Sequence, residues 1–175
     1  MTMFLKSLLE KPMNVQEYLA KKMLPREALA KKVHELRAAS KTIATLNGSF
    51  DLLHAGHLHM IFEASKQADV LIVALNSDAS IKQYKSPDRP IIPLKDRMSM
   101  MAALGFVTYV TSFDETDPRA LLEQIRPDVH VNGSEYGHNC IEAPVVKSAG
   151  GRIHIVDLIP GLSTTNILEK IKQCV

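Results

Sequence analysis

Short apolar runs alternate with helical segments along most of this chain. Residues 70–75 are apolar without interruption, which is typical of a strand buried on both faces of a parallel sheet. Four further β-branched or apolar runs predict strands at residues 42–46, 107–111, 129–131 and 153–156. The segments between them carry helical periodicity or a proline at the first helical turn. They predict helices at residues 25–39, 56–68, 78–84, 94–104, 118–125, 141–149 and 163–173.

This order of elements predicts an α/β fold. Five strands alternating with helices indicate a Rossmann-like, doubly wound parallel sheet, in which ligands bind beyond the carboxyl ends of the strands. A helical pattern already covers residues 14–39. We therefore expect an N-terminal helical arm at residues 1–23, followed by one domain at residues 24–175.

The composition narrows the classes of protein. Hydrophobic residues make up 46% of the chain and charged residues 23%, which argues against disorder. No apolar run reaches the roughly 18 residues that a membrane helix needs. Residues 1–9 lack the apolar stretch and cleavage site of a signal peptide. The two cysteines form no CxxC pair and indicate free thiols in a reducing compartment. These features predict a cytoplasmic protein with no membrane partner.

Positive charge is concentrated near the start of the chain. Residues 1–41 hold nine Lys or Arg against four Glu, a net charge of +5, whereas the remainder carries −3. A basic arm of this kind suits nucleic acid or another subunit. However, no aromatic side chains alternate with the basic ones, as nucleic-acid binding would favour. A solvated helix face is the simpler interpretation, and we expect no nucleic-acid partner.

Residues 47–57 combine the side chains best suited to chemistry, because they follow a predicted strand and open a helix. Gly48 lets backbone approach a ligand closely. Gly56 leaves room at the helix N-terminus, where free N–H groups and the helix dipole favour anions. His54 and His57 are three positions apart and project to the same side. Two imidazoles beside a phosphate can donate hydrogen bonds to charge that develops on it.

Two other interpretations compete with phosphate chemistry. The histidines can be purely structural, or they can form a metal site together with His59. His59 follows His57 by two residues and turns to another face, and no cysteine or carboxylate has suitable ligand spacing. The position of the pair around a glycine, at a strand-to-helix turn, favours phosphate binding. No metal held by protein side chains is expected.

Residues 48–57 read Gly-Ser-Phe-Asp-Leu-Leu-His-Ala-Gly-His, which resembles the HxGH signature of the cytidylyltransferase-like nucleotidyltransferases. The resemblance implies a Rossmann-like fold and direct in-line transfer of a nucleotidyl group. Other segments resemble the adenylyltransferase domain of ADP-heptose synthases, including Val-Asn-Gly-Ser-Glu-Tyr, which is similar to that family's VKGGDY. These segments are residues 76–80, 89–90, 93–94, 96–98, 131–136, 150–151 and 163–167. The resemblance covers about residues 24–173.

The resemblance also implies a reaction and a site. AMP would be transferred from ATP to a heptose 1-phosphate with release of pyrophosphate, giving ADP-heptose for the lipopolysaccharide core. The expected cofactor is Mg²⁺, and the expected assembly is a homo-oligomer. The catalytic residues would be His54, His57, Lys82 and Arg97. The nucleotide-binding residues would be Asn47, Gly48, Ser49, Phe50, Asp51, Gly56, Asn76, Asp78, Lys85, Arg89, Asn132, Gly133, Glu135, Ser163, Thr164 and Thr165.

Two of these segments also have a physical interpretation. The polar residues 82–89 are expected to form a mobile cationic flap over the triphosphate. The Ser-Thr-Thr turn that begins at Ser163 is expected to N-cap the last helix and to bind phosphate at the same helix end.

Four positions depart from the family pattern. Asn132 replaces the lysine of VKGGDY, Thr108 stands where an aspartate is usual, and Ser49 and Leu162 replace cysteines. The first two departures leave the substrate open.

Two alternative functions follow. One is a glycerol-3-phosphate cytidylyltransferase that uses CTP, although residues 158–161 lack the arginine of that group's RTEG segment. The other, from a different class, is a nucleotide sensor without catalysis, against which the intact histidine pair speaks.

Overall fold

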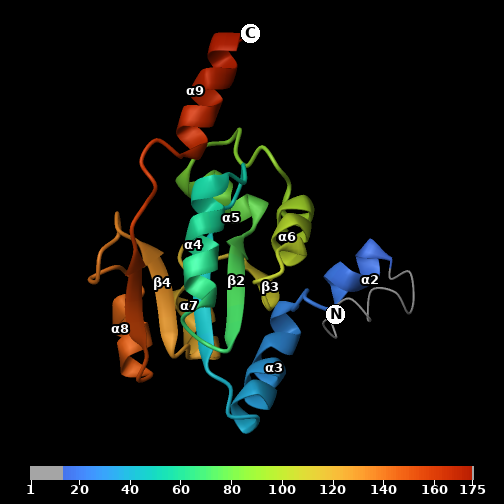
Figure 1. Ribbon diagram of the computed structural model, residues 1–175, viewed down its shortest axis with the longest axis vertical. Coiled ribbons are helices and arrows are strands. Elements are labelled where there is room, and N and C mark those ends of the chain that lie inside the picture. The colour runs from blue at the N-terminus through green and yellow to red at the C-terminus, as the bar shows by residue number, and fades with distance from the viewer. Residues whose placement is uncertain (1–13, 175) are drawn as a thin grey trace, which may run out of the picture.

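The computed structural model describes residues 14–174, and these contain one five-stranded parallel sheet (Figure 1). The order across the sheet is β3-β2-β1-β4-β5, and every neighbouring pair is parallel. Strand order therefore reverses between β1 and β4, as in Rossmann folds. This confirms the predicted doubly wound sheet. The strands are β1 (Ile43–Gly48), β2 (Val70–Asn76), β3 (Tyr109–Phe113), β4 (Val129–Gly133) and β5 (Arg152–Val156).

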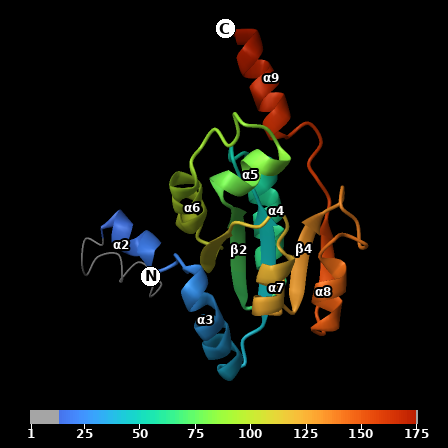
Figure 2. The same cartoon turned by 180° about the vertical axis from the view of Figure 1, so that it is seen from behind.

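Helices cover both faces of the sheet. Helix α4 (Ala55–Ser65) and α6 (Leu94–Ala103) pack on one face (Figure 1), and α3 (Arg26–Ala38) and α7 (Arg119–Ile125) pack on the other (Figure 2). Alternate residues of β2 serve the two layers. Val73 belongs to the core beneath α4 and α6, and Ile72 to the core beneath α3 and α7. All seven residues of β2 are buried, as its unbroken apolar run predicts.

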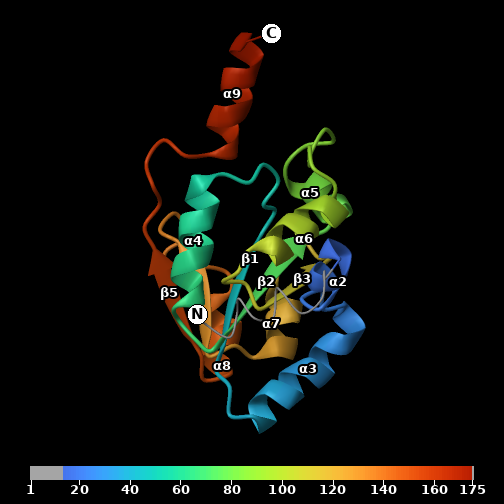
Figure 3. The ribbon, with the colours of Figure 1, turned by 45° about the vertical axis from the view of Figure 1, so that its right-hand side comes forward.

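The remaining helices lie around this core. They are α2 (Val15–Ala20), α5 (Asp78–Tyr84), α8 (Ala143–Ser148) and α9 (Thr164–Cys174). Helix α8 packs against β5 and α7. Helix α9 extends away from the body of the molecule, beyond the N-terminal end of α4 (Figure 3).

Strand β3 begins two residues later than the apolar run at residues 107–111 predicts. The Thr108 hydroxyl accepts a hydrogen bond from the Leu71 amide at 3.1 Å, so a side chain takes the place of a strand carbonyl there. Thr108 lies where β3 starts, at the opposite edge of the sheet from the carboxyl ends. Its side chain thus makes a local contact with the backbone of β2.

The described part of the N-terminal arm, residues 14–23, extends the β3 edge of the sheet. The Val110 amide donates to the Lys22 carbonyl, and the Leu24 amide donates to the Val110 carbonyl, both at 2.8 Å. The Lys22 ammonium also donates to the Leu104 carbonyl at 2.8 Å. Residues 1–13 of the arm lie outside the described residues. Within residues 14–174, no helix is both long enough and apolar enough to cross a bilayer.

Candidate active site

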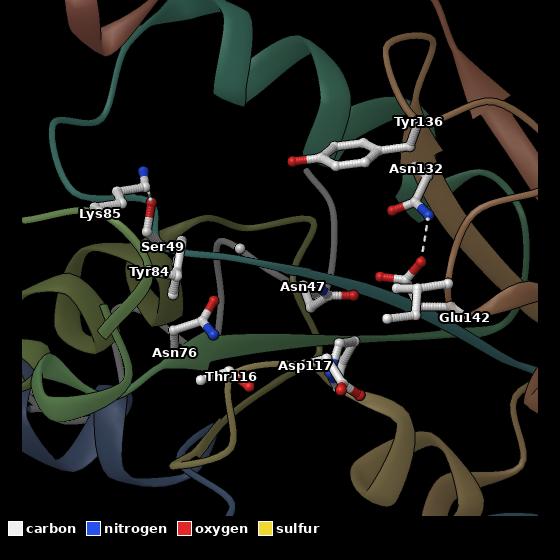
Figure 4. A pocket seen from close by; sticks show the side chains of 13 residues that line it. Asn47, Ser49, Asn76, Tyr84, Lys85, Thr116, Asp117, Asn132, Tyr136 and Glu142 are labelled. Atoms are coloured by element: carbon white, nitrogen blue, oxygen red, sulfur yellow. Dashed lines mark hydrogen bonds between the residues drawn. The ribbon is translucent and has the colours of Figure 1, made fainter. Parts of the chain in front are cut away.

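A cavity of about 310 Å³ opens at the carboxyl edge of the sheet, where β1 and β4 diverge (Figure 4). This is where doubly wound sheets bind ligands. In the figure, Lys85 and Ser49 lie on one side of the cavity and Asn132 and Glu142 on the other. The lining residues are Asn47, Gly48, Ser49, Asn76, Tyr84, Lys85, Thr116, Asp117, Pro118, Asn132, Tyr136, Ile141 and Glu142.

The histidine pair opens α4 as the sequence predicts. The two imidazole rings of His54 and His57 stack, with their centroids 3.8 Å apart and their planes 24° apart. Phe50 packs edge-on against His57, at 5.4 Å between ring centroids. Phe50 has a φ of 46°, which is rare for a residue with a side chain. Backbone strain of this kind concentrates at functional sites.

Both imidazoles are neutral at neutral pH. Burial lowers the pKa of His54 below its usual value. Burial, with smaller contributions from His54 and Lys85, lowers the pKa of His57 to about 4. A neutral imidazole carries one N–H, so each ring can donate one hydrogen bond to an anion without bringing a full charge.

The start of α9 meets the start of α4. A Cβ placed on Gly56 would lie 3.1 Å from the His54 ring and 3.2 Å from the Leu162 Cβ. The Ser163 hydroxyl accepts from the Asn166 amide at 3.1 Å, which confirms the predicted N-cap. Thr164 and Thr165 form the first turn of α9. Helix α4 has no side-chain cap, so its first N–H groups remain available for an anion.

Asp51 and Arg89 bind each other. The Asp51 carboxylate accepts from Arg89 Nε at 2.6 Å and from the amides of Ile92 at 2.8 Å and Ile91 at 3.0 Å. Burial raises the pKa of Asp51, but these three donors outweigh it and hold the pKa below its usual value. The contact fastens the end of the predicted flap to the loop that carries the histidines.

Arg97 lies fully buried beneath the site and joins several elements. Its guanidinium donates to the carbonyls of Ser49 at 2.6 Å, Ile92 at 2.9 Å and Asn76 at 3.0 Å. It also donates to the Asp78 carboxylate at 2.6 Å. A direct phosphate contact would require some of these bonds to break. In this structure Arg97 joins the ends of β1 and β2, and its catalytic role stays a prediction.

Among the residues that the structure describes, Lys85 is the one Lys or Arg that lines the cavity. Its ammonium donates to the Ser49 hydroxyl at 2.9 Å, and among residues 14–174 no carboxylate lies within ion-pair distance of it. Lys82 is exposed on α5 and does not line the cavity. Of the two lysines assigned to the triphosphate, only Lys85 is thus brought to the site in this structure.

The residues expected to bind nucleotide at the end of β4 and in the turn after it lie in different surroundings. Asn132 lines the cavity and donates from Nδ2 to Glu142 Oε2 at 3.2 Å. Glu135 is exposed, and its carboxylate occupies the space that a side chain on Gly133 would need. Tyr136, which ends the segment similar to VKGGDY, also lines the cavity. Glu142 and the segment 116–118 line it without having been predicted.

His130 lies in β4, two positions before Asn132. It is fully buried, and its Nδ1 is 2.8 Å from the Thr45 hydroxyl. Burial lowers its pKa to about 4, although Glu142 acts in the opposite direction. The ring therefore stays neutral at pH 7 despite the nearby carboxylate.

Stability is expected to fall between pH 6.5 and pH 4 because of His130. In this window the unfolded chain binds a proton on His130 and the folded chain does not, so unfolding becomes easier as the pH decreases. The loss from this group at pH 5, relative to pH 8, is about 2 kcal/mol. Urea unfolding at several pH values measures it. His130→Asn should flatten the profile, whereas the exposed control His34→Asn should not. An unchanged profile for His130→Asn would contradict the prediction.

Mg²⁺ has no protein cage in the described part of the chain. Residues 14–174 contain no group of three or more His, Cys, Asp or Glu side chains placed to hold a metal ion. Mg²⁺ commonly binds through substrate phosphates and water with one or two carboxylates. Binding of that kind needs no cage of protein ligands.

Comparisons with known proteins agree with this geometry. A family model described as cytidylyltransferase-like matches residues 45–169. The bifunctional protein HldE of Syntrophotalea carbinolica is 43% identical over 136 residues, which cover 77% of this chain and 28% of that protein. HldE of Pseudomonas entomophila is 46% identical over 138 residues, covering 78% of this chain and 29% of that protein. The chain thus spans less than a third of the length of these relatives.

A solved structure also shares the fold. The lipopolysaccharide core biosynthesis protein of Thermoplasma volcanium superposes with a TM-score of 0.55 and is 24% identical. The match covers 68% of this chain and 97% of that one. At this identity the likeness supports the fold alone.

Proposed function

Because this chain belongs to the cytidylyltransferase-like family of nucleotidyltransferases, as its HxGH motif predicts, we propose that it transfers AMP from ATP to a heptose 1-phosphate. The nucleotide and the sugar follow from the motifs similar to ADP-heptose synthases and from the relatives named HldE. The product, ADP-heptose, would serve lipopolysaccharide core synthesis.

One observation carries the proposal. Two neutral histidines stack at the uncapped N-terminus of α4, and His57 lies close enough to Lys85 for that ammonium to lower its pKa. Lys85 in turn lines the cavity beside Ser49. Free helix N–H groups, imidazole donors and an ammonium together suit the phosphates of a nucleotide.

The reaction needs no general base. An oxygen of the sugar phosphate attacks the α-phosphorus, the α–β phosphoanhydride bond breaks, and pyrophosphate leaves with its electron pair. A phosphate monoester oxygen is already an anionic nucleophile, so catalysis consists of positioning and charge stabilisation. His54 and His57 would donate to the α-phosphate and the bridging oxygen, and Lys85 would hold the distal phosphates. Arg97 and Asp51 would keep the supporting loops in place.

Pyrophosphate release from a matrix of four nucleoside triphosphates against several sugar phosphates tests the proposal. The highest kcat/KM is expected for ATP with a heptose 1-phosphate. If CTP with glycerol 3-phosphate gives the highest value, the heptose assignment is wrong and nucleotidyl transfer stands. Nucleotide binding without pyrophosphate release from any pair would identify a sensor instead.

A further inference from the structure

The wall of the cavity opposite Lys85 carries several hydrogen-bond acceptors. Asn47 lies near the end of β1, Asn132 in β4 and Glu142 at the N-cap of α8. Asn132 is 5% exposed and Glu142 is 6% exposed, yet both line the cavity. Three polar side chains from separate elements therefore converge on one buried surface, called here the acceptor wall (Figure 4).

The hydrogen bonds within the acceptor wall leave acceptors unused. Asn132 donates a hydrogen bond from Nδ2 to Glu142 Oε2, and this bond fixes the orientation of the amide. Figure 4 shows the other oxygen of each of these two side chains on the cavity side. Asn47 Oδ1 is buried and has no hydrogen-bond partner among residues 14–174. Buried acceptors without donors destabilise a protein unless a ligand or water supplies the donors.

No imidazolium neutralises the Glu142 carboxyl group from behind. His130 is the nearby basic side chain in β4, and burial lowers its pKa to about 4. Its Nδ1 is engaged with Thr45. Arg119 is close enough to feel the charge of Glu142, but among residues 14–174 it forms its ion pair with Asp117. The carboxyl group of Glu142 can therefore attract donors from the cavity side.

The two ends of the cavity consequently differ in charge. Lys85 and the start of α4 favour phosphates at one end, whereas a carboxylate repels them at the other. We propose that Glu142, with Asn132 and Asn47, binds the hydrogen-bond donors of the nucleoside part of the triphosphate. These donors are the ribose hydroxyls or the exocyclic amine shared by adenine and cytosine. This assignment rests on the proposed function, and it identifies the end of the cavity that selects the nucleoside.

Wild-type protein tests the assignment first, through dissociation constants measured by calorimetry. The probes are ATP, 2′-deoxy-ATP, 3′-deoxy-ATP, purine riboside triphosphate, which lacks the amine, and inorganic tripolyphosphate. Loss of one hydrogen bond to a charged acceptor is expected to weaken binding about ten- to a hundredfold. A deoxy analogue that binds more weakly than ATP identifies the ribose as the donor, and a weak purine riboside triphosphate identifies the amine. Equal binding of all four nucleotides would overturn the proposal.

The Glu142→Gln variant then locates the effect, with Glu123→Gln as a matched control on the exposed side of α7. Glu142→Gln should weaken ATP about ten- to a hundredfold and leave tripolyphosphate unchanged. The analogue that lacks the recognised donor should bind wild type and variant equally. Equal losses for ATP and tripolyphosphate would show a general disturbance and contradict the assignment, as would unaltered ATP binding in a folded variant.

The outcome is separable from that of the proposed function. Suppose that wild type releases pyrophosphate and that Glu142→Gln leaves the dissociation constant for ATP unchanged. Only the proposed role of the acceptor wall would then be refuted. The expected binding pattern without pyrophosphate release from any substrate pair would refute only the transfer reaction.

Discussion

Replacing His57 or His54 by alanine is expected to lower kcat by about 10² to 10³, the scale of one lost transition-state donor. His54 is the N-cap of α4, His57 lies in its first turn, and the two rings stack on each other. Their neutral state at pH 7 suits them to donate a hydrogen bond where negative charge grows on the α-phosphate. KM for the triphosphate should change less than kcat, because the interaction strengthens in the transition state.

His59→Ala is the matched control, since His59 lies on the same helix two residues beyond His57. Its turnover should stay near that of wild type, and this also tests the metal site that the three histidines would share. Circular dichroism checks that each variant is folded. Near-normal kcat in both His54→Ala and His57→Ala would refute the catalytic role.

The fold was predictable because each strand leaves a local signal. The apolar run of β2 reports burial on both faces, and the apolar or β-branched runs of the other strands report their place in the same sheet. Prediction failed by two residues at β3, where the Thr108 hydroxyl replaces a backbone acceptor. A side chain that imitates the backbone has no signature in hydrophobic periodicity.

The candidate site was predictable where it is local in sequence. Residues 47–57 contain the turn, the helix start and both histidines, so their proximity follows from chain connectivity alone. The partners of the charged residues did not follow. Arg89 binds Asp51 across 38 positions, and Lys85 binds Ser49 across 36. Whether such a cation pairs with a protein group or remains free to bind a ligand depends on the tertiary structure.

Glu142 escaped prediction for a related reason. A glutamate ahead of a short helix is usually a solvated side chain, and here it is 6% exposed. It reaches the cavity because the loop after β4 returns and lets Asn132 bind it across ten positions. The departure at Asn132 was visible in the sequence, whereas its partner was not.

Arg97→Met is expected to lower the free energy of unfolding by about 3–5 kcal/mol, the usual cost of removing one member of a buried charged network. For a chain of this size that corresponds to a fall in Tm of about 10 °C or more. The Arg97 side chain is fully buried and serves three carbonyls. Asp78 is 40% exposed and can be hydrated, so the carbonyls left without donors account for most of the loss.

Lys85→Met separates this positioning role from phosphate binding. Lys85 has one hydrogen bond to the exposed end of the β1 loop, so its loss should change stability by less than about 1 kcal/mol. Its ammonium faces the cavity, so KM for the triphosphate should rise in the variant. Thermal unfolding and steady-state kinetics on both variants give the comparison. If Arg97→Met keeps wild-type stability and raises KM as Lys85→Met does, the guanidinium leaves its carbonyl partners to bind phosphate. If stability falls as expected, Arg97 holds the ends of β1 and β2 so that Ser49 and the histidine loop face the cavity.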